Sequence, residues 1–256
     1  MLKRIIAFTT RFIPRHILQS VAGFFLKIIG FFYSGNKFED PISGKKYRKL
    51  LPYGRTIMRE NALAPHSMSL ERHRLIWLYL KNKTDFFVNP KKVLHIAPEY
   101  CFVKPFKKLK NLEYVTADLN SPWADVKMDV QNIPFEESTF DVVLCNHVLE
   151  HVASDIKAMQ EILRVLKPGG FAILQVPIDY SIETTLEDEK YNTPELREKY
   201  YQQRDHLRLY GRDYAQRLRN VGFAVIEDDF VKTLPKEQVT RYALPFNEIL
   251  YICKKE

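Results

Sequence analysis

The chain has 256 residues, of which 46% are hydrophobic and 27% are charged, and it is long enough to bury a sizeable core. Residues 1–60 hold 12 of the 39 basic residues but only 3 of the 31 acidic ones, so the net charge of +8 comes from this N-terminal region. The remainder is close to neutral, which excludes an extended basic surface for nucleic acid on the main part of the chain. The three cysteines are scattered, as in a reduced protein without a disulfide framework.

Residues 1–33 alternate basic and apolar side chains, and residues 17–33 are the most apolar part of the chain. The apolar stretch is short for the roughly 20 residues that cross a bilayer, and Gln19, Ser20 and Lys27 interrupt it. We expect residues 1–33 to form a helical arm that lies on an anionic membrane surface. Two alternatives stay open: an arm packed on the main domain or on a partner, and a true membrane span.

Residues 34–89 are predicted to form a small turn-rich lobe followed by a linking helix. Gly and Pro recur between residues 35 and 65, which is typical of turns. The helix is expected to begin after Ser69, with Glu71 in its first turn.

From residue 90 onwards, short apolar runs alternate with amphipathic segments, which predicts a parallel sheet with helices. The clearest run starts at Phe140 and breaks into polar residues at Asn146. Ser154 can then cap a helix. Because ligands bind beyond the carboxyl ends of parallel strands, these polar residues mark the expected site. We expect strands over residues 93–97, 112–117, 126–128, 142–144, 171–176, 223–226 and 248–253.

Two motifs carry a resemblance to a known family: residues 140–151 (FDVVLCNHVLEH) and residues 164–170 (RVLKPGG). With the order of elements, they make residues 90–256 resemble the class I S-adenosylmethionine-dependent methyltransferases of type 11. The resemblance implies a Rossmann-like α/β fold with a seven-stranded, mostly parallel sheet and helices on both faces. It also implies S-adenosylmethionine as the cofactor and an insertion over residues 178–210 that covers the substrate.

The resemblance places cofactor-binding residues at the strand ends. Asp118, followed by Leu119, stands where a carboxylate accepts both ribose hydroxyls, although an ordinary strand-end turn would also explain an Asp there. Asp129 stands where a carboxylate takes the adenine amino group, and the backbone amide of Val130 would meet the ring. Asn146 is a further candidate for cofactor binding.

The first loop departs from the family pattern, which has an acidic residue on the strand and then Gly-x-Gly. Here His95 replaces the acid, Ala97 is merely small, and Pro98 has no N–H to offer. We expect a rebuilt cofactor site that retains His95 and Ala97, with Glu99 facing the ammonium group of the cofactor. The competing interpretation is a catalytically inactive protein with this fold, which acts as a binding or scaffolding module at the membrane.

The lobe resembles a small zinc-binding module that precedes the catalytic domain in one subgroup of the family. The subgroup has two Cys-x-x-Cys pairs, and the matching segments here are residues 40–43 (DPIS) and 64–67 (APHS). Because all four cysteines are absent, we expect no structural zinc. We expect four side chains to hold the lobe: Tyr47, Leu50, Leu51 and Tyr53.

Residues 147–151 also fit the H-x-x-E-H pattern of one metalloprotease group. That pattern requires both His on one face of a helix, whereas this segment directly follows a strand. We therefore predict a loop here and no metal site.

Methyl transfer requires that the acceptor atom and the methyl group be aligned, and a hydroxyl or amine acceptor must also lose a proton. His206 is the candidate base, because it lies in the insertion expected to cover the acceptor, and His147 is expected to line the site. A structural role for either His stays open. We expect methylation of an O or N atom on a small-molecule, glycan or lipid-linked acceptor, with no nucleic-acid partner. The enzyme would be cytoplasmic and peripheral on the inner face of the membrane.

Overall fold

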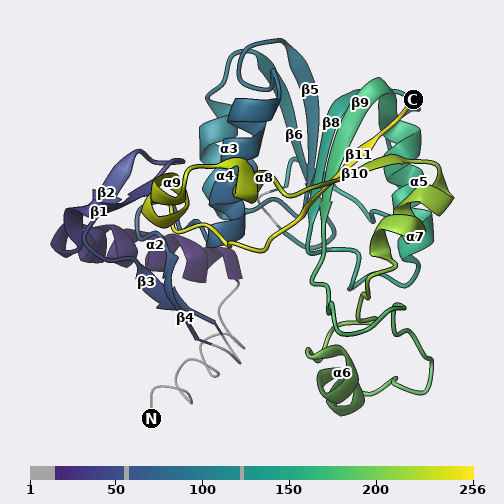
Figure 1. Cartoon of the computed structure of the whole chain (residues 1–256). Coiled ribbons are helices and arrows are strands. Elements are labelled where there is room, and N and C mark those ends of the chain that lie inside the picture. The colour runs from purple at the N-terminus through teal and green to yellow at the C-terminus, as the bar shows by residue number, and fades with distance from the viewer. Residues whose placement is uncertain (1–14, 55–57, 122–123) are drawn as a thin grey trace. The chain divides into compact units, whose positions relative to one another are not determined.

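The computed structural model describes residues 15–54, 58–121 and 124–256 (Figure 1). These residues divide into two compact units. Unit 1 contains the described residues up to Phe87 together with Glu99–Lys108 and Asp229–Glu248, and unit 2 contains Val88–Pro98, Leu109–Asp228 and Ile249–Glu256. Two stretches inside the predicted domain of residues 90–256 therefore cluster with the N-terminal part of the chain.

Unit 2 is built on a seven-stranded sheet with the strand order β10-β11-β9-β8-β5-β6-β7 (Figure 1). Strands β5 to β9 run parallel to one another, whereas β11 runs antiparallel to both β9 and β10. The strands are β5 (Lys91–Ile96), β6 (Leu112–Asp118), β7 (Val126–Lys127), β8 (Phe140–Asn146), β9 (Leu166–Gln175), β10 (Ala224–Asp228) and β11 (Leu250–Lys254). This confirms the predicted α/β class with a mostly parallel, seven-stranded sheet.

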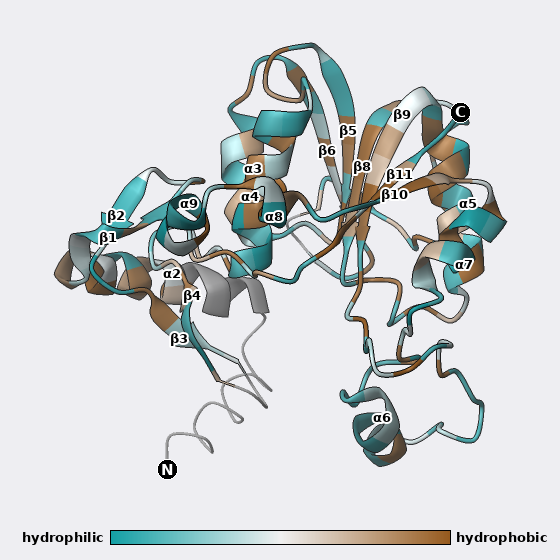
Figure 2. Cartoon of the chain, viewed as in Figure 1, coloured by the Kyte–Doolittle hydropathy of each residue, from teal (hydrophilic) through white to brown (hydrophobic). Residues whose placement is uncertain are grey.

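The central strands are apolar along their whole length because both faces of the sheet are buried. Val93 and Leu94 on β5 are inaccessible to solvent, as are residues 142–145 on β8. Figure 2 shows these strands as the most hydrophobic part of unit 2. Helices α5 (Asp155–Val165) and α7 (Tyr214–Val221) contribute Met159, Ile162 and Leu218 to the same core.

The predicted cap at Ser154 is present, because its side chain accepts a hydrogen bond from the backbone N–H of Lys157. Helix α5 ends at Val165 and β9 begins at Leu166, so the Lys-Pro-Gly-Gly run of the second motif lies within the strand. A Cβ atom on Gly170 would lie 2.9 Å from the carbonyl oxygen of Asp141, so the close approach of β9 to β8 requires glycine. Lys167 Nζ lies 3.0 Å from Asp141 Oδ1, which links the two family motifs.

The predicted insertion over residues 178–210 contains the short helix α6 (Pro194–Tyr201), which is capped by Thr193. Isolated bridges pair Ile178 with Tyr210, and Leu186 with Leu209. The insertion therefore leaves and rejoins the rest of unit 2 through adjacent backbone segments.

Unit 1 combines helices with two separate two-stranded sheets, β1-β2 and β3-β4. Its elements are α2 (Arg15–Phe32), β1 (Ser34–Asp40), β2 (Lys45–Tyr47), β3 (Leu51–Tyr53), β4 (Arg59–Leu63), α3 (Glu71–Lys83), α4 (Tyr100–Lys107), α8 (Phe230–Thr233) and α9 (Lys236–Arg241). Tyr47 and Leu50 are buried as expected, but the prediction for Tyr53 is wrong, because its side chain is 46% exposed.

Polar side chains occupy the turns where the zinc-module resemblance would require cysteines. Asp40 is completely buried, and its two carboxylate oxygens accept hydrogen bonds from the hydroxyls of Ser43 and Ser69. The same oxygens accept the backbone N–H groups of Ile42 and Ser43. One buried carboxylate thus accepts the hydroxyl and N–H donors of these turns.

Helix α2 packs on unit 1 through its glycines. Gly23 and Gly30 are buried, whereas the large apolar side chains around them face solvent. The exposed ones are Val21, Phe24, Phe25, Ile28, Ile29, Phe31 and Phe32. No described helix is both long enough and apolar enough to cross a membrane. The predicted membrane arm is described only from Arg15 onwards; its first 14 residues lie outside the described part.

Candidate active site

The candidate site lies where the strand order of the sheet reverses. Strand β5 stands between β6 and β8, so the chain moves outward from β5 in one direction to β6 and later in the other direction to β8. In parallel sheets the crevice beyond the carboxyl ends of two such strands is the usual ligand site. Asp118 ends β6, Asn146 ends β8, and Ala97 directly follows β5.

Two residues at this edge adopt the left-handed backbone conformation that usually favours glycine. Ala97 has φ 48° and His147 has φ 55°. The N–H of Ala97 donates to Ala117 O over 2.8 Å, and that of His147 to Gln175 O over 2.7 Å. Ala97 therefore keeps a backbone conformation suited to the glycine that the family has in this loop. Such strained positions gather at functional sites.

The two aspartates predicted to bind the cofactor form local turns. Asp118 Oδ1 accepts the backbone N–H groups of Asn120 and Ser121 over 2.7 and 2.6 Å. Asp129 is exposed, and its Oδ1 accepts the N–H of Gln131 over 2.9 Å. The alternative that the sequence left open for Asp118, a strand-end Asx turn, is thus present.

The other predicted cofactor residues differ in their surroundings. Leu119 is exposed, and Val130 is buried in the core of unit 2. The imidazole of His95 is buried within the sheet, where Nδ1 lies 2.7 Å from the hydroxyl of Tyr114. Glu99 belongs to unit 1, in which its Oε1 lies 4.0 Å from Nε2 of His73.

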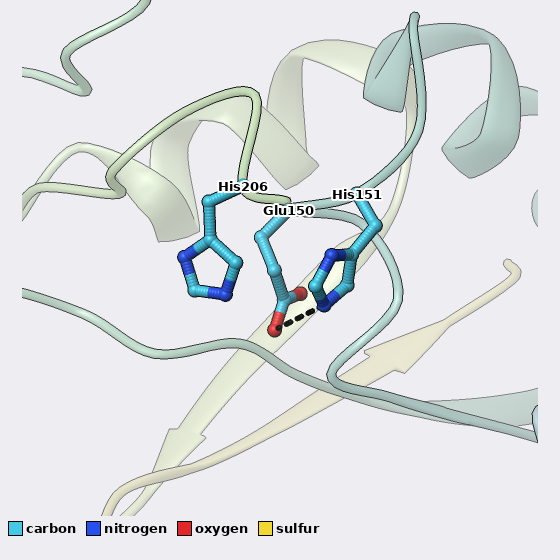
Figure 3. A group of neighbouring side chains, drawn as sticks. All are labelled: Glu150, His151 and His206. Atoms are coloured by element: carbon cyan, nitrogen blue, oxygen red, sulfur yellow. Dashed lines mark ion pairs between the residues drawn. The ribbon is translucent and has the colours of Figure 1, made fainter. Parts of the chain in front are cut away.

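The turn after β8 and the end of the insertion bring three side chains together: Glu150, His151 and His206 (Figure 3). Glu150 and His206 are 1% and 2% exposed, whereas His151 is more open to solvent. The rings of His151 and His206 lie edge to face with their centroids 4.8 Å apart. His147 joins the group, since its Nδ1 lies 3.3 Å from Glu150 Oε1.

Hydrogen bonds to backbone carbonyls determine which ring nitrogen of each His carries the proton. His206 Nδ1 lies 3.0 Å from Tyr201 O, and His151 Nδ1 lies 3.1 Å from Asp205 O. Because a carbonyl oxygen can only accept, both Nδ1 atoms carry the proton in the neutral rings and both Nε2 atoms present a lone pair. Burial lowers the pKa of His206 from its usual value, against the opposing effect of the Glu150 carboxylate.

The buried guanidinium of Arg208 holds this arrangement in place. It donates to the carbonyl oxygens of Leu149, Val152 and Ala153 over 2.6, 2.7 and 3.1 Å. Sequence reasoning missed Arg208, although an arginine two positions from His206 in a predicted active-site insertion was an available signal. Sequence reasoning also selected His147 and His206 without linking them to Glu150.

Residues 102–174 match the methyltransferase domain family, and the match spans strands β6 to β9. This stretch of the chain therefore belongs to a methyltransferase domain. The family whose model matches these residues is the one that the two sequence motifs implied. The chain also shares its fold with the [4+2]-cyclase SpnF, whose crystal structure matches it with a TM-score of 0.50 and 14% sequence identity. The match covers 93% of this chain and 96% of that one.

Curated relatives match only part of the chain. A sterol 4-C-methyltransferase of Caenorhabditis elegans is 38% identical over 63 residues, which make up 25% of this chain and 19% of that protein. A tRNA U34 carboxymethyltransferase of Nautilia profundicola is 27% identical over 128 residues, or 48% of this chain and 40% of that protein. The chain thus matches less than half the length of either relative.

Proposed function

We propose that the chain transfers the methyl group of S-adenosylmethionine to an oxygen or nitrogen atom of a small-molecule, glycan or lipid-linked acceptor. The observation that carries this proposal is the backbone at the reversal point, where Ala97 and His147 adopt positive φ angles at the ends of adjacent parallel strands. This preserves the path of a cofactor loop despite the loss of its glycines.

In this proposal Asp118 binds the ribose through the carboxylate oxygen that does not serve its turn, and Asp129 and Val130 lie toward the adenine. Asn146 lies near the sulfur-bearing part of the cofactor, since it ends the strand beside Ala97. Glu99 would balance the ammonium group, an assignment that rests on its position in the sequence. His95 supports the site through its bond to Tyr114.

His206 is the proposed proton acceptor. Its Nε2 is buried, presents a lone pair and has no hydrogen-bond partner among the described residues. The acceptor O–H or N–H would give its proton to this atom while the acceptor attacks the methyl carbon. The bond between carbon and sulfur breaks with its electron pair left on sulfur, and S-adenosylhomocysteine results. His147 lines the acceptor side, next to Glu150.

We also infer that α2 rests on an anionic lipid surface. Phe24, Phe31 and Phe32 are between 63% and 76% exposed, an arrangement that is costly in water. The same unit carries exposed basic residues on α2, on the β1–β2 hairpin and directly after it: Lys27, Lys37, Lys45, Lys46, Arg48 and Lys49. The combination of inserted apolar side chains and basic neighbours suits negatively charged headgroups. A lipid-linked or sterol-like acceptor would itself lie in such a surface, and one relative is named for a sterol.

Calorimetric titration of the full chain with S-adenosylmethionine and S-adenosylhomocysteine tests the cofactor site. We expect micromolar binding that Asp118→Ala weakens at least tenfold. Glu113→Ala is the matched control, because this exposed carboxylate lies on the same strand and pairs with Lys92. Absence of binding at millimolar ligand in folded protein would reject the enzyme and favour the scaffolding alternative.

A further inference from the structure

The turn after β8 and the end of the insertion place three ligand atoms around one point. The Nε2 or Nδ1 atoms of His151 and His206 and a carboxylate oxygen of Glu150 all lie within 4.8 Å of one another (Figure 3). His206 and Glu150 come from segments far apart in the sequence, and the backbone bond from Leu207 N to Glu150 O, 2.8 Å long, fixes them side by side.

With neutral imidazoles, the atoms that the group turns toward one another are all acceptors. Both His rings have their Nδ1 protons committed to carbonyl oxygens, so their Nε2 lone pairs are the atoms left to face the Glu150 carboxylate. Glu150 Oε2 and His206 Nε2 are buried without a hydrogen-bond partner among the described residues. Buried acceptors in this state are costly, and a cation between them removes the cost.

We propose that Glu150, His151 and His206 bind one divalent transition-metal ion of the zinc class. Two neutral imidazoles and one carboxylate form a common three-ligand set for such ions, whereas Mg²⁺ prefers oxygen ligands alone. Tetrahedral coordination brings ligand atoms to about 3.3 Å from one another, so the three side chains would draw in by small rotations. Three protein ligands leave a fourth position for a further ligand, and the partly exposed His151 gives the site access to solvent.

Neighbouring groups hold the three ligand side chains in position. Each His donates its second ring N–H to a backbone carbonyl, which fixes the tautomer that presents Nε2 to the ion. His147 lies 3.3 Å from Glu150 Oε1 and can orient the carboxylate without being a ligand. Arg208 secures the turn through three carbonyl oxygens. The sequence predicted no metal here, because His206 is brought to residues 150–151 only by the fold.

The role of the ion rests on the proposed methyl transfer. An acceptor hydroxyl bound at the open position would have its pKa lowered by the ion and would lose its proton to solvent. This oxygen would then attack the methyl carbon, and the carbon–sulfur bond would break with its electron pair left on sulfur, which gives S-adenosylhomocysteine. In the loaded protein the ion, rather than Nε2 of His206, would make the acceptor nucleophilic. Metal binding itself does not depend on this role.

Calorimetric titration with Zn²⁺ tests the site in the full chain, which is first stripped of metal with EDTA and kept in detergent. Titration with Co²⁺ adds a second signal, because its visible absorption reports low-coordinate geometry. We expect one ion per chain, with affinity reduced at least tenfold in His151→Ala and in Glu150→Gln. His206→Ala should have the same effect. Because His206 is buried, its variant can fail to fold, and the more exposed His151→Ala then still tests the site. His66→Ala is the control, since His66 is exposed and lies in unit 1.

Unchanged Zn²⁺ affinity in folded His151→Ala and Glu150→Gln, or stoichiometric binding of Mg²⁺ at the same concentration, would overturn the proposal. So would the absence of Zn²⁺ binding at micromolar concentration in folded wild-type protein. S-adenosylmethionine titration of the same samples separates the two proposals. Cofactor binding without Zn²⁺ binding would remove the metal site alone, and the reverse result would remove the proposed enzyme alone.

Discussion

Leu207 donates its backbone N–H to the carbonyl oxygen of Glu150 over 2.8 Å, and this bond joins the backbone at the end of the insertion to the turn after β8. His206 and Arg208, on either side of Leu207, then reach opposite parts of that turn. His206 approaches the Glu150 side chain, and Arg208 binds the turn's carbonyl oxygens. The candidate site therefore depends on how the insertion is attached as much as on the motif in β8.

Replacement of Arg208 should destabilise the protein strongly. The guanidinium is 1% exposed and binds three carbonyl oxygens and the Glu187 carboxylate, so Arg208→Met leaves the carbonyl oxygens of the turn without their donor. We expect the free energy of unfolding to fall by about 3 kcal/mol in urea denaturation. Arg212→Ala removes an exposed arginine paired with Glu183 and should cost less than about 1 kcal/mol. Equal losses would contradict the role of Arg208.

Ala97→Gly should stabilise the protein, contrary to the usual effect of introducing glycine. Ala97 has φ 48°, a conformation that costs a non-glycine residue about 1–2 kcal/mol. Glycine also gains entropy in the unfolded chain, so the net gain should be about 0.5 kcal/mol. Ala97→Val should lower stability. The comparison is Ala117→Gly, within the buried part of β6, which should lower it as well. A loss in Ala97→Gly equal to that in Ala117→Gly would show that the backbone is not strained there.

Glu99→Ala should weaken binding of S-adenosylmethionine by about tenfold or more, because a charged hydrogen bond to the ammonium group would be lost. Glu113→Ala should leave binding unchanged, since this carboxylate pairs with Lys92 on the sheet surface. Calorimetry of both variants decides the assignment. Equal affinities for the two variants would remove Glu99 from the cofactor site.

The local sequence pattern predicts much of the fold but only part of the candidate site. The apolar runs at β5 and β8 and the Ser154 cap depend on neighbouring residues, so they could be predicted. The strand ends at Asp118 and Asn146 then follow from the rule for parallel sheets. The approach of His206 to Glu150 could not, because it depends on the path of a long insertion. Likewise, no local signal predicts that residues 99–108 cluster with the N-terminal part of the chain.

Asp155 should make stability depend on acid pH. Burial raises the pKa of this carboxyl group. Hydrogen bonds from Arg217 and Tyr210 and the charge of Arg208 lower it by more than burial raises it, so the pKa lies below its usual value. A depressed native pKa adds stability that is fully present above the ordinary aspartate pKa of about 3.9 and is lost as pH falls through the native value.

Asp155→Asn should therefore lower the free energy of unfolding at pH 7 and flatten its decline between about pH 5 and pH 2. Urea denaturation at a series of pH values measures both effects. Asp229→Asn, at an exposed carboxylate, provides the control. A decline as steep in Asp155→Asn as in the wild type would mean that other groups cause the acid sensitivity.

The combined variant Phe24→Glu, Phe31→Glu should release the protein from lipid. Both rings are exposed on α2, and burial of one such ring contributes about 1.5–3 kcal/mol. We expect cosedimentation with phosphatidylglycerol vesicles to fall at least tenfold. Val88→Glu, which alters an exposed apolar residue outside α2, should bind as the wild type does. Equal binding by the two variants, or equal binding to neutral vesicles, would favour a protein partner for this face.

The glycine contacts of α2 have a practical consequence for handling the protein. A Cβ atom on Gly30 would lie 3.1 Å from Pro65 Cβ, and one on Gly23 would lie 3.4 Å from the hydroxyl of Tyr100, so the helix backbone itself covers the lobe. Removal of residues 1–33 to improve solubility would uncover Tyr47 and Pro65 and exchange one apolar surface for another. A mild detergent or a lipid nanodisc, which shields the outer face of α2 and leaves the inner one in place, is the better route to a monodisperse sample.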